Sequence, residues 1–275
     1  MAQVRLAGIP GGFATRRSGA RLADFVAQAM LKTELHIHTG DDPTDYIPYS
    51  TNDLIDRAAG LNYQALAITL HERQLDLARY EAYARARGIV LIPGVERTIE
   101  GKHVLLLNFR DGADRISTFA ELADLRRRDH GLVIAPHPFF PAPVCLGTQL
   151  TRHAELFDAV ELNYFYTKLV DFNRPAVRWA RAHGKPVVAN TDVHRLEQLG
   201  PTYTLVDADP SADSICRAIR AGRVAMQTEP ISSMTAARHV VRLAEAFLRG
   251  PAGEAAAHGA ARPAAAADAP SSSAA

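Results

Sequence analysis

The sequence is poor in cysteine and has no excess of charge of either sign. Its two cysteines, Cys145 and Cys216, lie far apart in a chain of 275 residues, so neither a disulfide framework nor a zinc ribbon is indicated. The formal net charge is +1, which argues against a surface that coats nucleic acid, although a local basic patch is compatible with such an average. We therefore expect a protein of the reducing cytoplasm.

Long uninterrupted apolar runs are also missing. Glycine, proline and arginine break up residues 1–30, so we expect neither a signal peptide nor a membrane span. Residues 1–31 are interpreted as an N-terminal extension that is partly ordered, and residues 250–275, rich in Ala, Pro and Ser, as a disordered tail. The folded domain is expected over residues 32–249, where the 47% apolar content of the chain suffices for a large core.

No glycine-rich nucleotide-binding fingerprint follows any predicted strand, which removes the commonest reason to expect an open, doubly wound sheet. Instead, strand-like and helix-like segments alternate along the domain. This α/β pattern favours a distorted (β/α)7 barrel, similar to a TIM barrel, with functional groups at the C-terminal ends of the strands. Helices are predicted at residues 50–59, 73–87, 117–130 and 174–183, and after residues 209–210.

The segment 89–104 is the centre of the predicted fold. Residues 89–96 form an apolar strand that ends at Glu96. A turn at residues 100–101 would make a hairpin in which Thr98 lies opposite His103. Glu96 then lies diagonally across the ladder from His103, roughly 7–8 Å away, and two such side chains can bind the same metal ion.

Six histidines and two carboxylates fall at the same end of successive predicted strands. The His36 and His38 pair, spaced by two along a strand, can present both imidazoles to one ion, while Glu34 would orient them from behind. The pattern as a whole predicts a metal site. Its members are His36, His38, His71, Glu96, His103, His137, Asp192 and His194.

In this order, the motifs resemble the PHP (polymerase and histidinol phosphatase) family of metal-dependent phosphoesterases. The matching segments are the His36/His38 pair, residues 67–71, residues 93–96, His103, residues 135–138 and residues 191–194. The resemblance implies a barrel that binds two or three divalent metal ions (Zn, Mn or Fe) and hydrolyses a phosphate monoester or diester.

The resemblance also implies roles for the individual residues. His36, His38, Glu96 and Asp192 would form a first metal site, Glu96 would bridge to a second site with His103 and His137, and His71 and His194 would belong to a third. The third site needs one more ligand, for which Asp41, Asp42 and Asp45 are the candidates. The family usually has a polar residue just before the histidine of the second motif, where this chain has Leu70.

Catalytic roles are expected for Glu96, Asp192 and His194, the last as a possible proton donor to the leaving group. Arg195 and Asn163 are the candidate substrate-binding residues, with a solvated surface charge as the alternative for Arg195. The composition favours a small-molecule phosphoester over nucleic acid. Two other functions stay open: a weakened barrel that acts as a binding or regulatory module, and a C–N hydrolase of the amidohydrolase type. The sequence predicts no oligomeric state.

Overall fold

The computed structural model describes residues 30–241, and the fold is described here for the unit that ends at Ala236. The expectations for residues 1–29 and for the tail at 250–275 lie outside the described residues, as does the end of the predicted domain beyond residue 241. No helix within 30–241 is long and apolar enough to cross a membrane.

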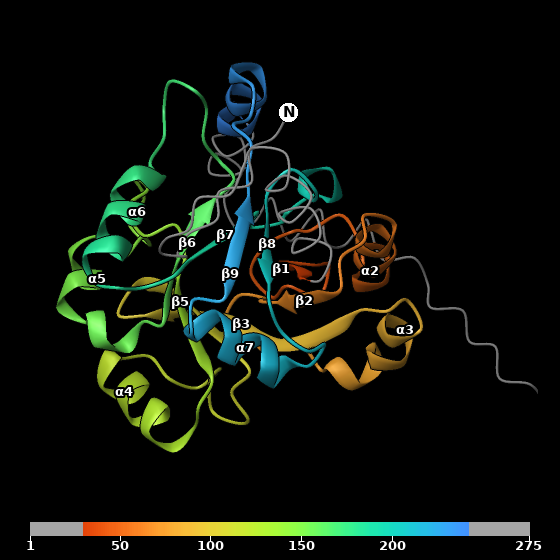
Figure 1. The fold of residues 1–275 in the computed structure, drawn as a ribbon, viewed down its shortest axis with the longest axis horizontal. Helices are drawn as coiled ribbons and strands as arrows, with labels where there is room; N and C mark the ends of the chain where they lie inside the picture. The colour runs from red at the N-terminus through yellow and green to blue at the C-terminus, as the bar shows by residue number, and fades with distance from the viewer. Residues whose placement is uncertain (1–29, 242–275) are drawn as a thin grey trace, which may run out of the picture. The chain divides into compact units, whose positions relative to one another are not determined.

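Nine strands form a single sheet in the order β7-β6-β5-β4-β3-β2-β1-β8-β9 (Figure 1). Strands β1 to β3 are parallel to one another, and so are β5 to β7. Strand β4 runs antiparallel between β3 and β5, and β8 runs antiparallel to β1 and β9. The strands are β1 (Leu31–Ile37), β2 (Ala65–Ile68), β3 (Val90–Ile99), β4 (Lys102–Leu107), β5 (Leu132–Ala135), β6 (Ala159–Asn163), β7 (Val187–Asn190), β8 (Tyr203–Val206) and β9 (Val224–Gln227).

The sheet curls until its two ends nearly meet. A parallel bridge joins Ile37 at the end of β1 to Val193 beyond β7, through hydrogen bonds of 3.0 Å from His38 N to Val193 O and from Val193 N to His36 O. The predicted α/β barrel-like fold is thus confirmed. The count of seven repeating units is not, because β4 and β8 interrupt the parallel order.

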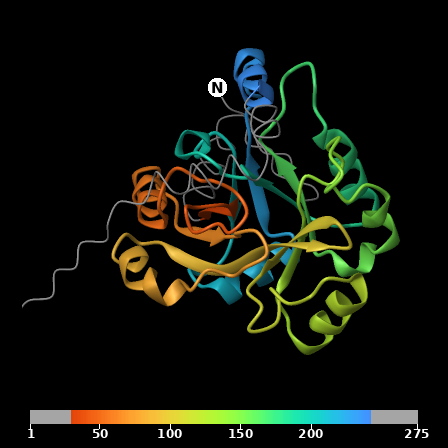
Figure 2. The same ribbon diagram turned by 180° about the vertical axis from the view of Figure 1, so that it is seen from behind.

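Helices lie around the outside of this sheet (Figures 1 and 2). Two begin close to their predicted starts at residues 50 and 117, where Ser50 and Thr118 each cap a helix through a capping box, with Asp53 and Glu121 respectively. The helices are α2 (Thr51–Gly60), α3 (Glu81–Arg85), α4 (Phe119–Arg128), α5 (Thr148–Arg152), α6 (Asn173–Ala182) and α7 (Ala212–Arg220), with 3₁₀ turns η1 (Leu77–Arg79), η2 (Ala154–Leu156) and η3 (Leu196–Gln198).

The predicted single helix over residues 73–87 is wrong. Asp76 has an extended backbone (φ −70°, ψ 93°) and caps the short turn η1 by accepting a hydrogen bond from Ala78 N. Because a helix cannot run through an extended residue, the segment forms only η1 and the five-residue α3.

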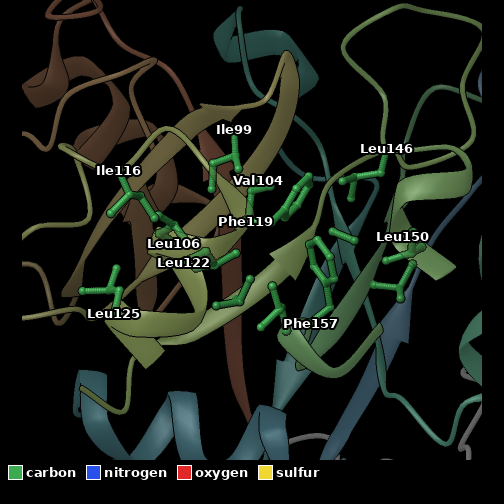
Figure 3. Close-up of a cluster of buried hydrophobic side chains, with 14 of the residues drawn as sticks. Ile99, Val104, Leu106, Ile116, Phe119, Leu122, Leu125, Leu146, Leu150 and Phe157 are labelled. Carbon is green, nitrogen blue, oxygen red and sulfur yellow. The ribbon is translucent and has the colours of Figure 1, made fainter. Parts of the chain in front are cut away.

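Three apolar clusters hold the unit together. One fills the barrel interior and includes Leu35, Ile92 and Ile134, with Ile215 and Ile219 of α7 packed against it. A second lies between the sheet and α4 to α6, where the side chains labelled in Figure 3 converge. The third lies under α2 and α3. Burial of each large apolar side chain contributes about 1.5–3 kcal/mol to the stability of the fold. The strand ends that carry the polar groups are therefore held in place by well-packed apolar clusters.

The predicted β3–β4 hairpin is confirmed in its register. Thr98 pairs with His103 and Ile99 with Lys102. The turn residues Glu100 and Gly101 have positive φ angles of 48° and 75°, as a tight two-residue hairpin requires. The hairpin therefore brings Glu96 and His103 to the same rim of the barrel.

Candidate metal centre

The eight side chains predicted from the sequence lie together at one rim of the barrel. His36 and His38 come from the end of β1, Glu96 from β3 and His103 from the start of β4. His71 follows β2 and is joined to Glu96 by a parallel bridge. The others follow β5 and β7; they are His137, Asp192 and His194.

Glu96 is the carboxylate on which the imidazoles converge, and its side chain is only 2% exposed. Its two oxygens face different histidines. Oε2 lies 3.2 Å from His36 Nε2, 3.3 Å from His38 Nε2 and 3.2 Å from His71 Nε2, whereas Oε1 lies 2.7 Å from His103 Nδ1 and 3.4 Å from His137 Nε2.

Asp192 closes the same cluster from the opposite edge of the barrel. Its Oδ1 lies 3.4 Å from His36 Nε2, 3.5 Å from His38 Nε2 and 3.3 Å from His194 Nδ1. Asp192 has a φ of 57° and His137 a φ of 28°. Such left-handed backbone in residues other than glycine is strained and collects at functional sites.

Several atoms of this cluster are buried without a hydrogen-bond partner among the described residues. They are His36 Nε2, His38 Nε2, Glu96 Oε1 and Asp192 Oδ1. They lie close to opposing groups, but not in hydrogen-bond geometry. Buried polar atoms normally find partners, and nitrogen and oxygen atoms that face a common point are the donor set of a divalent cation. Groups drawn from these residues have ligand atoms within 4.8 Å of one another, so the residues fit a metal centre.

The far nitrogen of most of these imidazoles is held by a second group. His36 Nδ1 lies 2.8 Å from Glu161 Oε2, His38 Nδ1 lies 2.9 Å and His71 Nδ1 3.1 Å from Asp42 Oδ2, His137 Nδ1 lies 3.4 Å from Cys145 Sγ, and His194 Nδ1 lies 3.0 Å from Asp192 O. Such partners fix the ring orientation and leave the other nitrogen free for an ion.

The three aspartates that the sequence could not tell apart have different surroundings. Asp41 accepts hydrogen bonds from Thr51 Oγ1 and Tyr80 Oη, away from the histidines. Asp42 is buried between His38 and His71. Asp45 lies 3.2 Å from His194 Nε2 and its side chain is 38% exposed.

The carboxylates and imidazoles of the cluster shift one another's pKa values. Burial disfavours the charged forms of Glu96 and Asp192, but the imidazoles, His36 foremost, hold the pKa of both carboxyls well below the usual range. Burial likewise disfavours charged His36, yet the carboxylates of Asp192 and Glu96 raise its pKa well above the usual range. The carboxylates are therefore ionised and available as ligands.

Glu34 does not have the role predicted for it. The β1–β2 register shifts between Glu34 and Ile37, so the period of two does not hold across this segment. The Glu34 Oε1 atom instead accepts a hydrogen bond of 3.0 Å from Thr191 N, and burial raises the pKa of the Glu34 carboxyl to about 8. The carboxylate behind His36 is Glu161, which sequence reasoning missed; an acid in the otherwise apolar run of residues 159–162 was the available signal.

The two candidate substrate-binding residues lie in different settings. Asn163 is buried, and its amide donates to Glu161 Oε1 and accepts from Phe165 N. Arg195 is exposed, and its backbone N–H is held by Gln198.

Leu70, the departure from the family pattern, does not point at the histidines. Its side chain is fully buried in the apolar cluster under α2 and α3, with Ile37, Ile68 and Leu54. The substitution therefore fills the core and leaves the set of ligand candidates intact.

Comparisons with known proteins bear on the fold. A family model described as PHP-associated matches residues 171–224. The resemblance to the PHP family is confirmed. A two-domain protein from Bacteroides vulgatus, which contains a predicted PHP-like metal-dependent phosphoesterase, superposes with a TM-score of 0.55 at 18% identity over 73% of this chain. PsfC from Pseudomonas syringae gives a TM-score of 0.54 at 16% identity, covering 77% of this chain and 96% of PsfC.

A third solved structure of this PHP-like fold is a lesion-specific endonuclease from Pyrococcus furiosus, with a TM-score of 0.50 at 16% identity over 70% of this chain. This chain covers 65% of the Bacteroides protein and 56% of the endonuclease. A search of the curated proteins found no match. At these identities the likenesses establish a shared fold.

The expectation that a near-neutral charge disfavours nucleic acid is wrong. An endonuclease has the same fold, and the average charge of a chain does not describe the field at one rim of its barrel.

Proposed function

We propose that this chain is a metal-dependent hydrolase of phosphate esters. The observation that carries the proposal is the convergence of five imidazoles on the two oxygens of Glu96. Two of the facing atoms, His36 Nε2 and His38 Nε2, are buried without a hydrogen-bond partner among the described residues. The same rim carries the motifs of the PHP resemblance, and the PHP-like fold of the solved structures supports the assignment.

We assign two or three divalent ions to this rim. Glu96 is suited to bridge two of them, because its oxygens face separate groups of histidines: His36, His38 and His71 on Oε2, and His103 and His137 on Oε1. Asp192 completes the set around His36 and His38. For a third ion, beside His71 and His194, Asp45 is the better candidate, because Asp42 is already saturated with hydrogen bonds.

When bound, divalent ions neutralise the charge of a phosphoester and make a water molecule nucleophilic at neutral pH. The chain's own residues supply the rest. Glu96 and Asp192 keep the centre anionic. His194, with a side chain 34% exposed, is the candidate proton donor to the leaving alkoxide when its Nε2 atom holds no third ion. Arg195 is the exposed cation next to His194, where it can bind a phosphate oxygen.

The proposal covers both monoesters and diesters, and both small molecules and nucleic acid as substrates. Because an endonuclease has the same fold, polynucleotides are included among the candidate substrates. The leaving-group and diester preferences have to come from a substrate panel.

The test combines elemental analysis by plasma mass spectrometry with turnover of p-nitrophenyl phosphate, bis-p-nitrophenyl phosphate and an oligonucleotide duplex with an abasic site, each with and without added Mn²⁺. We expect two or three ions per chain and hydrolysis that depends on them. Glu96→Ala should lose metal at both sites that Glu96 would bridge, whereas Asp41→Asn, on the same rim but away from the histidines, should retain it. A wild-type protein that binds these ions but cleaves no ester in the panel would contradict the proposed activity.

A further inference from the structure

We infer that Glu161 is a positioning residue that fixes the tautomer of His36, so that its Nε2 atom is free to bind an ion. The inference rests on the proposed function, since it assigns His36 to the metal centre. Glu161 is 0% exposed and contacts His36 through Nδ1, the nitrogen that faces away from Glu96.

Glu161 is fully buried on β6 and accepts four hydrogen bonds. Its Oε2 atom is approached by His36 Nδ1 at 2.8 Å and by Asn190 Nδ2 at 3.1 Å, and its Oε1 atom by Asn163 Nδ2 at 3.0 Å and by His137 N at 3.2 Å. These donors come from β1, β7, β6 and the segment after β5. One carboxylate therefore ties together the C-terminal ends of four strands.

A carboxylate can only accept hydrogen bonds, so the proton between Glu161 and His36 belongs to His36 Nδ1. In a neutral imidazole, the other nitrogen then carries a lone pair. That nitrogen is Nε2, the atom that faces Glu96 and Asp192 without a hydrogen bond.

Replacing Glu161 with glutamine should reverse this arrangement in a defined way. The Oε1 side must remain an oxygen, because His137 N is a fixed backbone donor. Asn163 is fixed there as well, since turning its amide would take its oxygen away from Phe165 N. The new NH₂ group must therefore face His36 and Asn190.

Asn190 can accept a hydrogen bond from that NH₂ group by turning its amide, whereas His36 can accept one only by changing its tautomer. The Asn190 Oδ1 atom has no partner among the described residues, so this amide can turn and accept a hydrogen bond. His36 can accept one only at an unprotonated Nδ1, which moves its proton to Nε2, the nitrogen needed for metal binding. Glu161→Gln thus preserves volume and packing but blocks one ligand atom.

The experiment uses the full chain with Glu161→Gln, and Asp158→Asn as the matched control. Asp158 is a buried carboxylate three residues earlier in sequence, and its partners are Arg126, Arg220 and the backbone of Val133, away from the histidines. Long-range ¹H–¹⁵N spectra of the metal-free protein, at a pH where the imidazoles are uncharged, report the His36 tautomer. Competition with a chelator reports affinity for Zn²⁺ and Mn²⁺.

We expect the His36 proton on Nδ1 in the wild type and in Asp158→Asn, and on Nε2 in Glu161→Gln. We also expect metal affinity about 10- to 100-fold lower in Glu161→Gln alone. An unchanged tautomer, or an equal loss of affinity in both variants, would overturn the inference. The NMR measurement needs neither metal nor turnover. A protein that hydrolyses no ester would contradict the proposed function, whereas the spectra alone decide whether Glu161 fixes the tautomer of His36.

Discussion

Asp42 offers a sharp test of how the centre is organised, because both of its oxygens are saturated. Oδ2 accepts from His38 Nδ1 at 2.9 Å, His71 Nδ1 at 3.1 Å and His71 N at 3.0 Å, and Oδ1 accepts from Thr44 N at 2.9 Å and Asp45 N at 3.0 Å. Asparagine has only one oxygen, so Asp42→Asn must place an NH₂ group against donors on one side or the other.

The better orientation keeps the oxygen on the histidines and leaves the N–H groups of Thr44 and Asp45 unpaired. Because Thr44 is exposed and Asp45 partly so, water can reach these amides, and the cost per group is at the lower end of the usual range, about 1 kcal/mol each. We therefore expect Asp42→Asn to lower the free energy of unfolding by about 2 kcal/mol and metal affinity by about 10-fold or more.

The neighbouring aspartates provide the controls. Asp41 accepts from two hydroxyl groups that can rotate, so Asp41→Asn should change stability by less than about 1 kcal/mol and retain all metal. Asp45→Asn should keep its stability, because the side chain is partly exposed and water can replace its contact, but lose the ion beside His194. Urea unfolding of the metal-free proteins and plasma mass spectrometry measure the two quantities. Equal behaviour of the Asp41 and Asp42 variants would refute the reasoning.

Two further predictions concern stability. Burial alone would raise the pKa of the Asp158 carboxyl, but Arg126 holds that pKa below its usual range. The ionised carboxylate therefore stabilises the fold above about pH 4, and this stabilisation is lost as the pH falls through the lowered pKa of Asp158. Asp158→Asn should cost about 2–4 kcal/mol at pH 7, with the gap to wild type closing in acid; a gap independent of pH in urea unfolding would contradict this. Leu70→Asp should destabilise by about 3 kcal/mol or more, because the new carboxylate is buried among apolar side chains; a gain in bound metal without loss of melting temperature would show that residue 70 faces the centre.

Much of the fold was predictable because the local signals agreed with the global structure. The hairpin register followed from a two-residue turn, and the starts of α2 and α4 followed from serine and threonine, residue types that commonly cap helices. Residues 73–87 were not predictable in the same way, because their apolar spacing resembles a helix while Glu72 and Asp76 set a turn that depends on contacts with β3, such as Glu72 N to Glu96 O.

The ligand candidates were predictable because parallel strands end at the same rim, so strand-end histidines must meet. The partners behind them were not, since they depend on which strands become neighbours when the sheet curls. Glu161 contacts His36 across 125 positions, and no periodicity within β6 could reveal that. Glu34 was misassigned for a different reason: its role was predicted from a period of two along β1, and the register shift between Glu34 and Ile37 breaks that period.

The contact between β1 and the segment after β7 determines at what stage of folding the candidate metal centre can form. The hydrogen bond from Thr191 to Glu34 joins residues 157 positions apart, and Asp192 and His194 reach His36 and His38 across the same contact. During synthesis, His36 and His38 can therefore meet Asp192 and His194 only after almost the whole barrel has been made. An ion that binds only the closed form raises the free energy of unfolding by about 2.7 kcal/mol when its free concentration is 100 times its dissociation constant. If the proposed ions occupy the centre in the cell, a shortage of metal would leave more of this chain in open forms exposed to proteases.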